Sequence, residues 1–213
     1  METLVRKARR DDAGFLAWAI REAGRAHLDR GWYDIALGLP EAEALEVLRR
    51  LVLTRTPSWW RFDNFLVAEV GGSLAGALCA FDARTGWTGS EAALAEATEP
   101  LGWDEDRRKA FWTRGAYVFS CTLESLGDVW VIENVATVPE FRGQGVAGRL
   151  LLAALETGRR RGFKTAQLSF VIGNDSAERT YIKAGFHLET ESRHADFEAA
   201  VGAPGLKRFI RKL

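Results

Sequence analysis

A glycine-rich segment in the second half of the 213-residue chain has the composition of an anion-binding turn. It runs Arg142-Gly143-Gln144-Gly145-Val146-Ala147-Gly148. Glycine lets the backbone approach an anion closely, and a helix start offers unpaired N–H groups at the positive end of its dipole. A pyrophosphate is therefore the expected ligand of the N–H groups from Gly143 to Gly148.

Two regular elements must hold this turn. Residues 129–138 are rich in β-branched side chains and are followed by Pro139, which is typical of a buried strand. After the turn, apolar residues recur at helical spacing and form one face: Val146, Leu150, Leu151, Ala154 and Leu155.

The spacing disfavours a dinucleotide site, although Gly143, Gly145 and Gly148 formally match that fingerprint. In a dinucleotide fold the glycines follow the strand directly, and an acidic residue ends the next strand about 20 residues later. Here four residues, 139–142, intervene before the first glycine, and the next expected strand, 165–171, ends without a carboxylate.

Residues 135–147 instead resemble the acetyl-CoA signature of the GNAT superfamily of N-acetyltransferases. The core of that signature is Arg/Gln-x-x-Gly-x-Gly/Ala, and its three places are filled by Arg142, Gly145 and Ala147. The resemblance covers residues 129–190 and continues through a strand and three further features in order: Asn174, Tyr181 and Ala184-Gly185-Phe186.

The resemblance implies how acetyl-CoA is held. Its pantetheine arm would pair with the edge of a splayed strand at Val135, Ala136 and Thr137, whose backbone groups would also orient or polarise the thioester carbonyl. Asn174 would contact the cofactor. Asn174 is also a good helix-entry residue, so a purely structural role stays open.

Two residues are candidates for proton transfer. The resemblance makes Tyr181 the general acid, because a phenol with a pKa near about 10 stays protonated at neutral pH and can donate to a departing thiolate. Glu133 is the candidate base, since a carboxylate inside a buried strand is costly unless it faces a cleft or is paired. For Tyr181 the alternative is side-chain packing. For Glu133 the alternatives are a structural hydrogen bond to the neighbouring strand and simple attraction for an ammonium substrate.

Composition narrows the class of protein. Lys plus Arg and Asp plus Glu each number 29, so the formal net charge is zero, and no nucleic-acid or membrane partner is expected. No apolar run approaches the roughly 20 residues that span a bilayer, and a signal-peptide core is not evident. Two cysteines do not suggest a disulfide framework, and the histidines show no metal-ligand pattern. A cytoplasmic protein without a metal is expected.

The pattern predicts one α/β domain over residues 1–213, with a twisted mixed sheet of about seven strands flanked by helices. The expected strands are 4–8, 65–70, 74–81, 129–138, 165–171, 187–192 and 207–212. Gly76 indicates a bulge or a close backbone approach. Trp32 and Tyr33 fall in an expected loop, and 201–205 reads as the turn-rich loop between the last two strands.

A helical insertion at 83–128, with helices at 90–97 and from Asp104 to about Leu123, is expected between the third and fourth strands. It could be a lid, a substrate wall, a cover for the sheet or a dimer contact. Trp59, Trp60, Trp103 and Trp112 could line an aromatic pocket, but a place in the core is the favoured interpretation.

Taken with the resemblance, these features predict transfer of an acetyl group from acetyl-CoA to a primary amine of a small molecule or peptide, by direct attack in a ternary complex. An acyltransferase that uses a longer acyl-CoA is one alternative. The other is a CoA-binding sensor or interaction module with weak turnover, which the presence of both Glu133 and Tyr181 disfavours.

Overall fold

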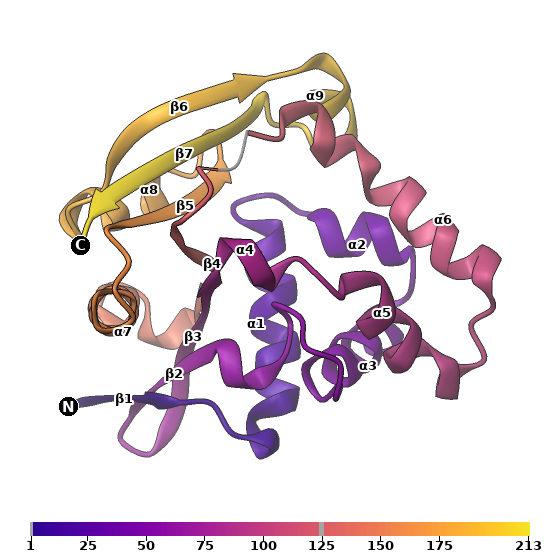
Figure 1. Ribbon diagram of the computed structural model, residues 1–213, viewed down its shortest axis with the longest axis horizontal. Coiled ribbons are helices and arrows are strands. Elements are labelled where there is room, and N and C mark those ends of the chain that lie inside the picture. Colours follow the sequence, from indigo (N-terminus) through magenta and orange to yellow (C-terminus); the bar gives the residue numbers. More distant parts are fainter. Residues whose placement is uncertain (1, 124–125) are drawn as a thin grey trace.

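The computed structural model describes residues 2–123 and 126–213, and its frame is a seven-stranded sheet in the order β1-β2-β3-β4-β5-β7-β6 (Figure 1). β4 and β5 are parallel, and the other neighbouring strands are antiparallel. The predicted mixed α/β sheet is confirmed. The strands are β1 (Thr3–Lys7), β2 (Phe65–Val70), β3 (Ser73–Asp82), β4 (Trp130–Thr137), β5 (Thr165–Val171), β6 (His187–Arg193) and β7 (Gly205–Lys212).

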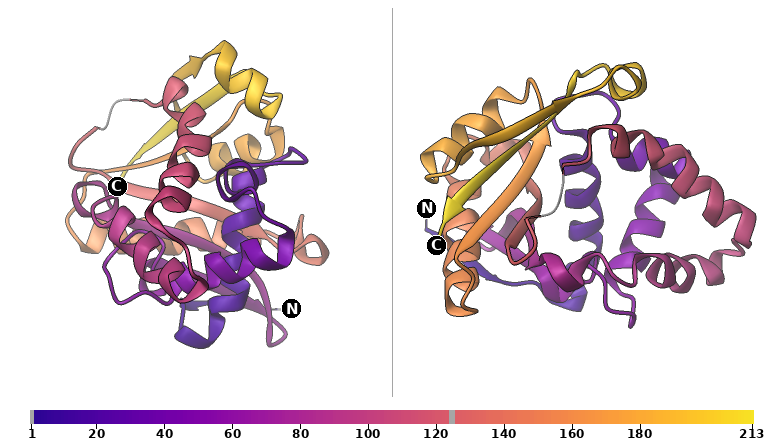
Figure 2. Two further views of the ribbon diagram at one scale, coloured as in Figure 1. Left: turned by 90° about the vertical axis from the view of Figure 1, so that its right-hand side faces the viewer. Right: turned by 45° about the horizontal axis from the view of Figure 1, so that its top comes forward.

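Helices cover both faces of the sheet. α7 contacts β2, β3 and β4 on one face, and α1 contacts β3 and β4 on the other. Figure 2 (right) shows α7 and the group formed by the earlier helices on opposite sides of the strands. The helices are α1 (Ala13–Arg25), α2 (Trp32–Leu37), α3 (Glu41–Val52), α4 (Ala83–Gly86), α5 (Ser90–Thr98), α6 (Glu105–Gly115), α7 (Val146–Arg160), α8 (Asp175–Lys183) and α9 (Ala195–Val201).

Alternating side chains of the central strands supply two separate cores. Cys79 and Val131 point into the core beneath α1 and α3, whereas Leu78 and Ile132 point into the core beneath α7. A strand covered on both faces reads as a continuous apolar run, which is why β4 could be predicted from the sequence. The charged Glu133 stands out against this run.

The predicted helical insertion is present between β3 and β4, and residues 83–123 and 126–128 of it are described. Asp104 caps α6 as expected, because its carboxylate accepts a hydrogen bond from the Arg107 N–H at 2.8 Å. The helix ends at Gly115, however, and the chain continues as a 3₁₀ segment, η4 (Ala116–Cys121). The Trp32 indole packs on Gly115 and donates to its carbonyl at 2.9 Å, which draws that carbonyl away from the helical ladder.

Two connections contain helices that the sequence did not predict. Trp32 and Tyr33 lie in α2, because the Asp34 carboxylate accepts from the Gly31 N–H at 3.0 Å and is held by Arg21 and Arg25. These arginines come from α1, so the local sequence of residues 32–37 does not predict α2. The loop expected between the last two strands is preceded by α9, which begins after His194, whose ring nitrogen accepts from the Asp196 N–H.

Gly76 shows both features that its position suggested. The register of β2 and β3 shifts beside it, and a Cβ at this position would stand 2.8 Å from the Ala136 carbonyl oxygen and 3.0 Å from a Val146 methyl group. Gly76→Ala should therefore lower the free energy of unfolding by about 1–3 kcal/mol, measured by urea denaturation. Gly14→Ala on α1 is the control, since its Cβ meets nothing within 4 Å and should stabilise the helix by roughly 0.5–1 kcal/mol. An unchanged unfolding free energy in Gly76→Ala would contradict the close approach.

None of the helices that the structure describes is long and apolar enough to cross a bilayer. Within residues 2–123 and 126–213, His, Cys, Asp and Glu side chains do not gather in groups of three or more that could hold a metal ion. Cys79 and Cys121 are both buried free thiols.

Candidate active site

β4 and β5 separate halfway along the sheet. Their pairing is confined to three residue pairs: Trp130 with Ala166, Val131 with Gln167 and Ile132 with Leu168. From Glu133 onward, β4 keeps its β3 partner and β5 keeps its β7 partner, but the two strands no longer pair in the part of the chain that is described. The backbone edge of β4 that faces β5 is therefore open to a guest with peptide-like hydrogen bonds.

A β-bulge marks the point of separation. Cys79 pairs with Glu133 and Ala77 with Ala136, so Asn134 and Val135 together lie opposite the single residue Leu78. Asn134 has φ of 53°, a left-handed conformation uncommon outside glycine. Bulges of this kind bend a strand and re-aim its side chains, and they are frequent beside active sites.

The opening belongs to a cleft of about 1870 Å³ that runs from the glycine turn to the insertion. It brings together twelve of the thirteen site residues predicted from the sequence: Glu133, Val135, Ala136, Thr137, Arg142, Gly143, Gly145, Val146, Ala147, Gly148, Asn174 and Tyr181. Gln144 is not in the lining. Its side-chain amide donates to the Glu140 carbonyl at 2.9 Å and so holds the turn.

The glycine turn presents its backbone to this cleft. Gly143 and Gly145 have φ of 77° and 80°, and α7 begins directly afterwards with no side-chain cap on its first N–H groups. A Cβ at Gly143, Gly145 or Gly148 would meet nothing within 4 Å. Arg142 donates to the Thr137 carbonyl at 3.2 Å and ties the turn to the end of β4. Open space in front of uncapped N–H groups is what a phosphate ligand requires.

Two buried polar atoms at the floor of the cleft also lack partners. Gln167 Oε1 and Asn134 Nδ2 make no hydrogen bond among the described residues, although Asn134 lies beside the Tyr33 hydroxyl. Buried polar groups are normally paired. An acceptor and a donor left open at the separated strands fit an amide-bearing guest such as pantetheine.

Asn174 combines the two roles that the sequence left open. Its side-chain oxygen accepts from the Ala177 N–H at 3.2 Å and caps α8, and the residue also lines the cleft. The structural role is therefore observed, and a cofactor contact stays a prediction.

Tyr181 stands on α8 with its ring in the core beneath α7, 5.2 Å from the Phe170 ring. It also lines the cleft, and its hydroxyl makes no hydrogen bond among the described residues. Burial, with a smaller contribution from the Glu133 charge, raises the pKa of the Tyr181 phenol above its usual value. The phenol therefore keeps its proton at neutral pH and remains a free donor.

Glu133 lies where the strands part, enclosed by protein yet in contact with the cleft. Its carboxylate has no ion pair or hydrogen bond within residues 2–123 and 126–213, and desolvation alone raises its pKa to about 8. Its charge in turn raises the pKa of Tyr33, Cys79 and Tyr181, so all three lie within its electrostatic reach. An unpaired carboxyl with a pKa near neutrality is suited to proton transfer.

The family follows from the sequence as a whole. Residues 32–186 match the model of the acetyltransferase (GNAT) family. The chain belongs to this family. It is an acyltransferase, as the signature at residues 135–147 predicted. No curated protein sequence matches the chain.

Solved structures of acetyltransferases share the fold. An N-acetyltransferase from Staphylococcus aureus Mu50 is 20% identical, with a TM-score of 0.67 over 98% of this chain and 100% of that one. A Drosophila melanogaster polyamine N-acetyltransferase is 15% identical, with a TM-score of 0.56 and full coverage of both chains. The Salmonella typhimurium protein YncA, solved with acetyl-CoA, is 16% identical, with a TM-score of 0.58 over 100% and 95% of the two chains.

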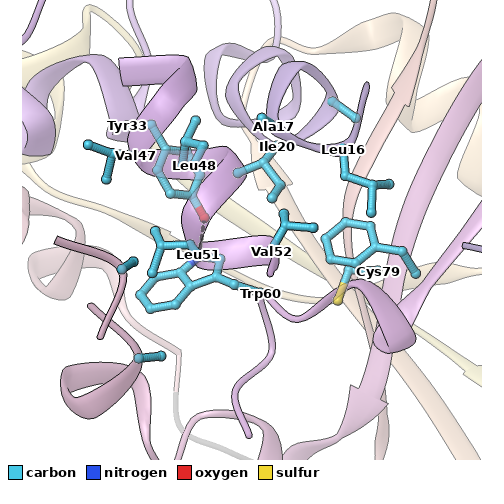
Figure 3. Close-up of a cluster of buried hydrophobic side chains, with 14 of the residues drawn as sticks. Leu16, Ala17, Ile20, Tyr33, Val47, Leu48, Leu51, Val52, Trp60 and Cys79 are labelled. Atoms are coloured by element: carbon cyan, nitrogen blue, oxygen red, sulfur yellow. Dashed lines mark hydrogen bonds between the residues drawn. The ribbon is translucent and has the colours of Figure 1, made fainter. Parts of the chain in front are cut away.

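Other residues of this GNAT cleft were not assigned from the sequence. Tyr33 is buried, and its hydroxyl accepts a hydrogen bond from the Trp60 indole at 2.8 Å, drawn as a dashed line in Figure 3. His27 is exposed and lies at the rim of the cleft beside Gly173. Tyr33 and His27 line the cleft because the α1–α2 region packs against distant parts of the chain. The local sequence does not predict such contacts.

The tryptophans divide between the cleft and the core. Trp59, Trp60 and Trp112 line the cleft, although Trp60 is also almost fully buried. Trp103 does not line it, and packs in the core beneath the guanidinium of Arg107. The insertion contributes Trp112 and residues of α5 and η4 to the lining, so it forms one wall of the cleft.

Proposed function

We propose that this GNAT protein transfers the acetyl group of acetyl-CoA to a primary amine by direct attack within a ternary complex. The observation that carries the proposal is the opening between β4 and β5, with the unpaired Glu133 at its start and Tyr181 on the same cleft. The cleft extends from the glycine turn on one side to the insertion on the other. Two substrates can therefore bind together, one from each side.

Main-chain groups hold the acyl donor in this proposal. The N–H groups of residues 143–148 bind the pyrophosphate, and the open edge of β4 at residues 135–137 pairs with the pantetheine arm. Arg142, Arg149 and Lys183 also line the cleft, and their positive charge suits the phosphates. Acetyl-CoA supplies the activated acetyl thioester.

Glu133 and Tyr181 move the protons. Glu133 accepts a proton from the acceptor ammonium, and the resulting neutral amine forms a bond to the acetyl carbon while the carbon–sulfur bond breaks. Tyr181 donates its proton to the departing sulfur and regains one through water, as the nitrogen loses its second proton on forming the amide. Glu133 releases the proton that it accepted to solvent. A general base is most effective when its pKa lies near the working pH, and burial raises the pKa of Glu133 toward that range. The raised pKa of Tyr181 keeps the phenol protonated, so that it can act as the acid.

Tyr181→Phe should lower kcat by about 10²- to 10³-fold, because it removes the proton donor. Release of free CoA thiol from acetyl-CoA, with a primary amine present, gives the rate. The dissociation constant for acetyl-CoA and the melting temperature should stay close to wild type, since phenylalanine keeps the ring contacts with Phe170. Full turnover in Tyr181→Phe would remove this residue from the mechanism.

A further inference from the structure

The acceptor side of the cleft is walled by aromatic rings. We define the acceptor wall as the five tryptophans among the described lining residues: Trp32, Trp59, Trp60, Trp87 and Trp112.

The indoles of the wall are in contact with one another. Trp87 lies 5.0 Å from Trp59, Trp59 lies 5.0 Å from Trp60, and Trp60 lies 6.3 Å from Trp112 between ring centroids. Trp87 is 45% exposed, Trp59 is half-buried, and Trp60 is buried. The wall is therefore a continuous aromatic surface that runs from solvent to the interior.

The wall ends close to Glu133. Cys79, the β3 partner of Glu133, donates through its thiol to the Trp59 carbonyl at 3.1 Å. On the other side, Tyr33 accepts from the Trp60 indole and lies within reach of the Glu133 charge. If the amine group of an acceptor lies at Glu133, the rest of the acceptor therefore lies against the indoles of the wall.

Acidic and basic lining residues come from different parts of the chain. Among the described lining residues before β4, Glu22 and Glu91 are charged, and lysine and arginine are missing from that set. The basic lining residues, Arg142, Arg149, Lys183 and Arg208, come from the part of the chain after β4.

Glu22 lies 3.5 Å from the Arg25 guanidinium, and Glu91 is exposed at the rim. Glu133 is then the single unpaired carboxylate deep among the described lining residues. This arrangement suits one ammonium on a flat apolar body, since aromatic faces bind both rings and cations. An acceptor with a carboxylate beside its amine is disfavoured, because that carboxylate would lie close to the Glu133 charge. A polyamine is disfavoured because the described lining has no further buried carboxylates for its additional ammonium groups.

We propose that the acceptor is an arylalkylamine, a primary amine joined by a short linker to an aromatic ring, without a carboxylate. The ring stacks on Trp59 and Trp87 while the amine meets Glu133. This inference rests on the proposed acetyl transfer and specifies its acceptor.

A panel of amines tests the proposal on the wild-type protein, with CoA release as the readout. 2-Phenylethylamine should exceed both phenylalanine, which adds a carboxylate, and spermidine, which replaces the ring with further ammonium groups. A kcat/KM at least roughly tenfold higher is expected. An equal or reversed order, or a preference for the N-terminus of a short peptide, would overturn it.

The wall itself is tested by Trp87→Ala, which removes an exposed ring and should leave the fold intact. KM for 2-phenylethylamine should rise roughly tenfold, with kcat and the dissociation constant for acetyl-CoA unchanged, and Trp87→Phe should restore most of the loss. Trp18→Ala is the control, because Trp18 also contacts a neighbouring ring, that of Phe15, but lies outside the cleft lining. An unchanged KM in Trp87→Ala would contradict stacking.

The two proposals fail in different ways. If acetyl-CoA does not bind and no amine releases CoA, acetyl transfer itself is wrong. If acetyl-CoA binds and spermidine or a peptide is the better acceptor, acetyl transfer stands and the arylalkylamine assignment is wrong.

Discussion

Replacing Gly145 with glutamate should weaken acetyl-CoA binding at least roughly 100-fold, which corresponds to about 2.7 kcal/mol. A side chain at this position points into open space, since a Cβ would meet nothing within 4 Å. Gly145 lines the cleft and directly precedes the uncapped N–H groups of α7, so a glutamate there brings a negative charge beside the expected pyrophosphate. Isothermal titration of wild type and variant with acetyl-CoA measures the change.

Gly162→Glu is the matched control. Gly162 follows the other end of α7 and has a similar φ of 88°, and a Cβ there would also meet nothing within 4 Å. Both variants place a glutamate in the left-handed region, which costs about 1–2 kcal/mol, so their melting temperatures should fall to a similar extent. Acetyl-CoA binding should survive only in Gly162→Glu. Equal affinity in the two variants would refute the pyrophosphate assignment.

Glu133→Gln should lower kcat/KM by about 10²- to 10⁴-fold, because the amide cannot accept the amine proton. Wild-type activity should rise with pH through about 8 as the Glu133 carboxyl ionises. That limb should vanish in the variant, which leaves only the titration of the acceptor amine. Glu105→Gln, at an exposed position on α6 outside the cleft, controls for loss of one charge. An unaltered pH profile in Glu133→Gln would exclude Glu133 as the base.

The same substitution should stabilise the protein at alkaline pH. Burial raises the pKa of Glu133 from 4.5 to about 8, so below about pH 4.5 the group is protonated in both folded and unfolded chains. As the pH rises from about 4.5 to about 8, the unfolded chain releases this proton first. The free energy of unfolding therefore falls by up to about 1.4 kcal/mol per pH unit.

Glutamine carries no such proton. Glu133→Gln should therefore be more stable than wild type at about pH 8 in urea denaturation, and the two proteins should converge below about pH 4.5. Equal stability at both pH values would show that the carboxyl is better solvated than its surroundings indicate. A residue that costs stability and supports turnover is typical of an active site.

The sequence predicts the part of the cleft that is built from one continuous stretch. Strand, turn and helix follow one another over residues 129–160, so β-branched composition, closely spaced glycines and one apolar helix face place the glycine turn correctly. Gly143 and Gly145 have positive φ there. Asn174 and Tyr181 follow at fixed distances, at the start of α8 and within it. Local physical chemistry dominates there.

The acceptor side could not be predicted in the same way. α2 forms because arginines of α1 bind Asp34, and α6 ends at Gly115 because an indole 83 residues away takes its carbonyl. Trp59 and Trp112 look like core residues in isolation, and their place on the cleft depends on how the insertion packs. Gln144 failed to reach the lining for a local reason, the bond of its own amide to Glu140.

Calorimetric titration of the wild-type protein with acetyl-CoA, and separately with NAD, tests the central claim most directly. The open edge of β4 and the glycine turn predict one acetyl-CoA molecule bound per chain at about micromolar affinity, or about −8 kcal/mol, and no binding of NAD. Binding of NAD alone, or of neither compound, would contradict the assignment of this cleft to acetyl-CoA.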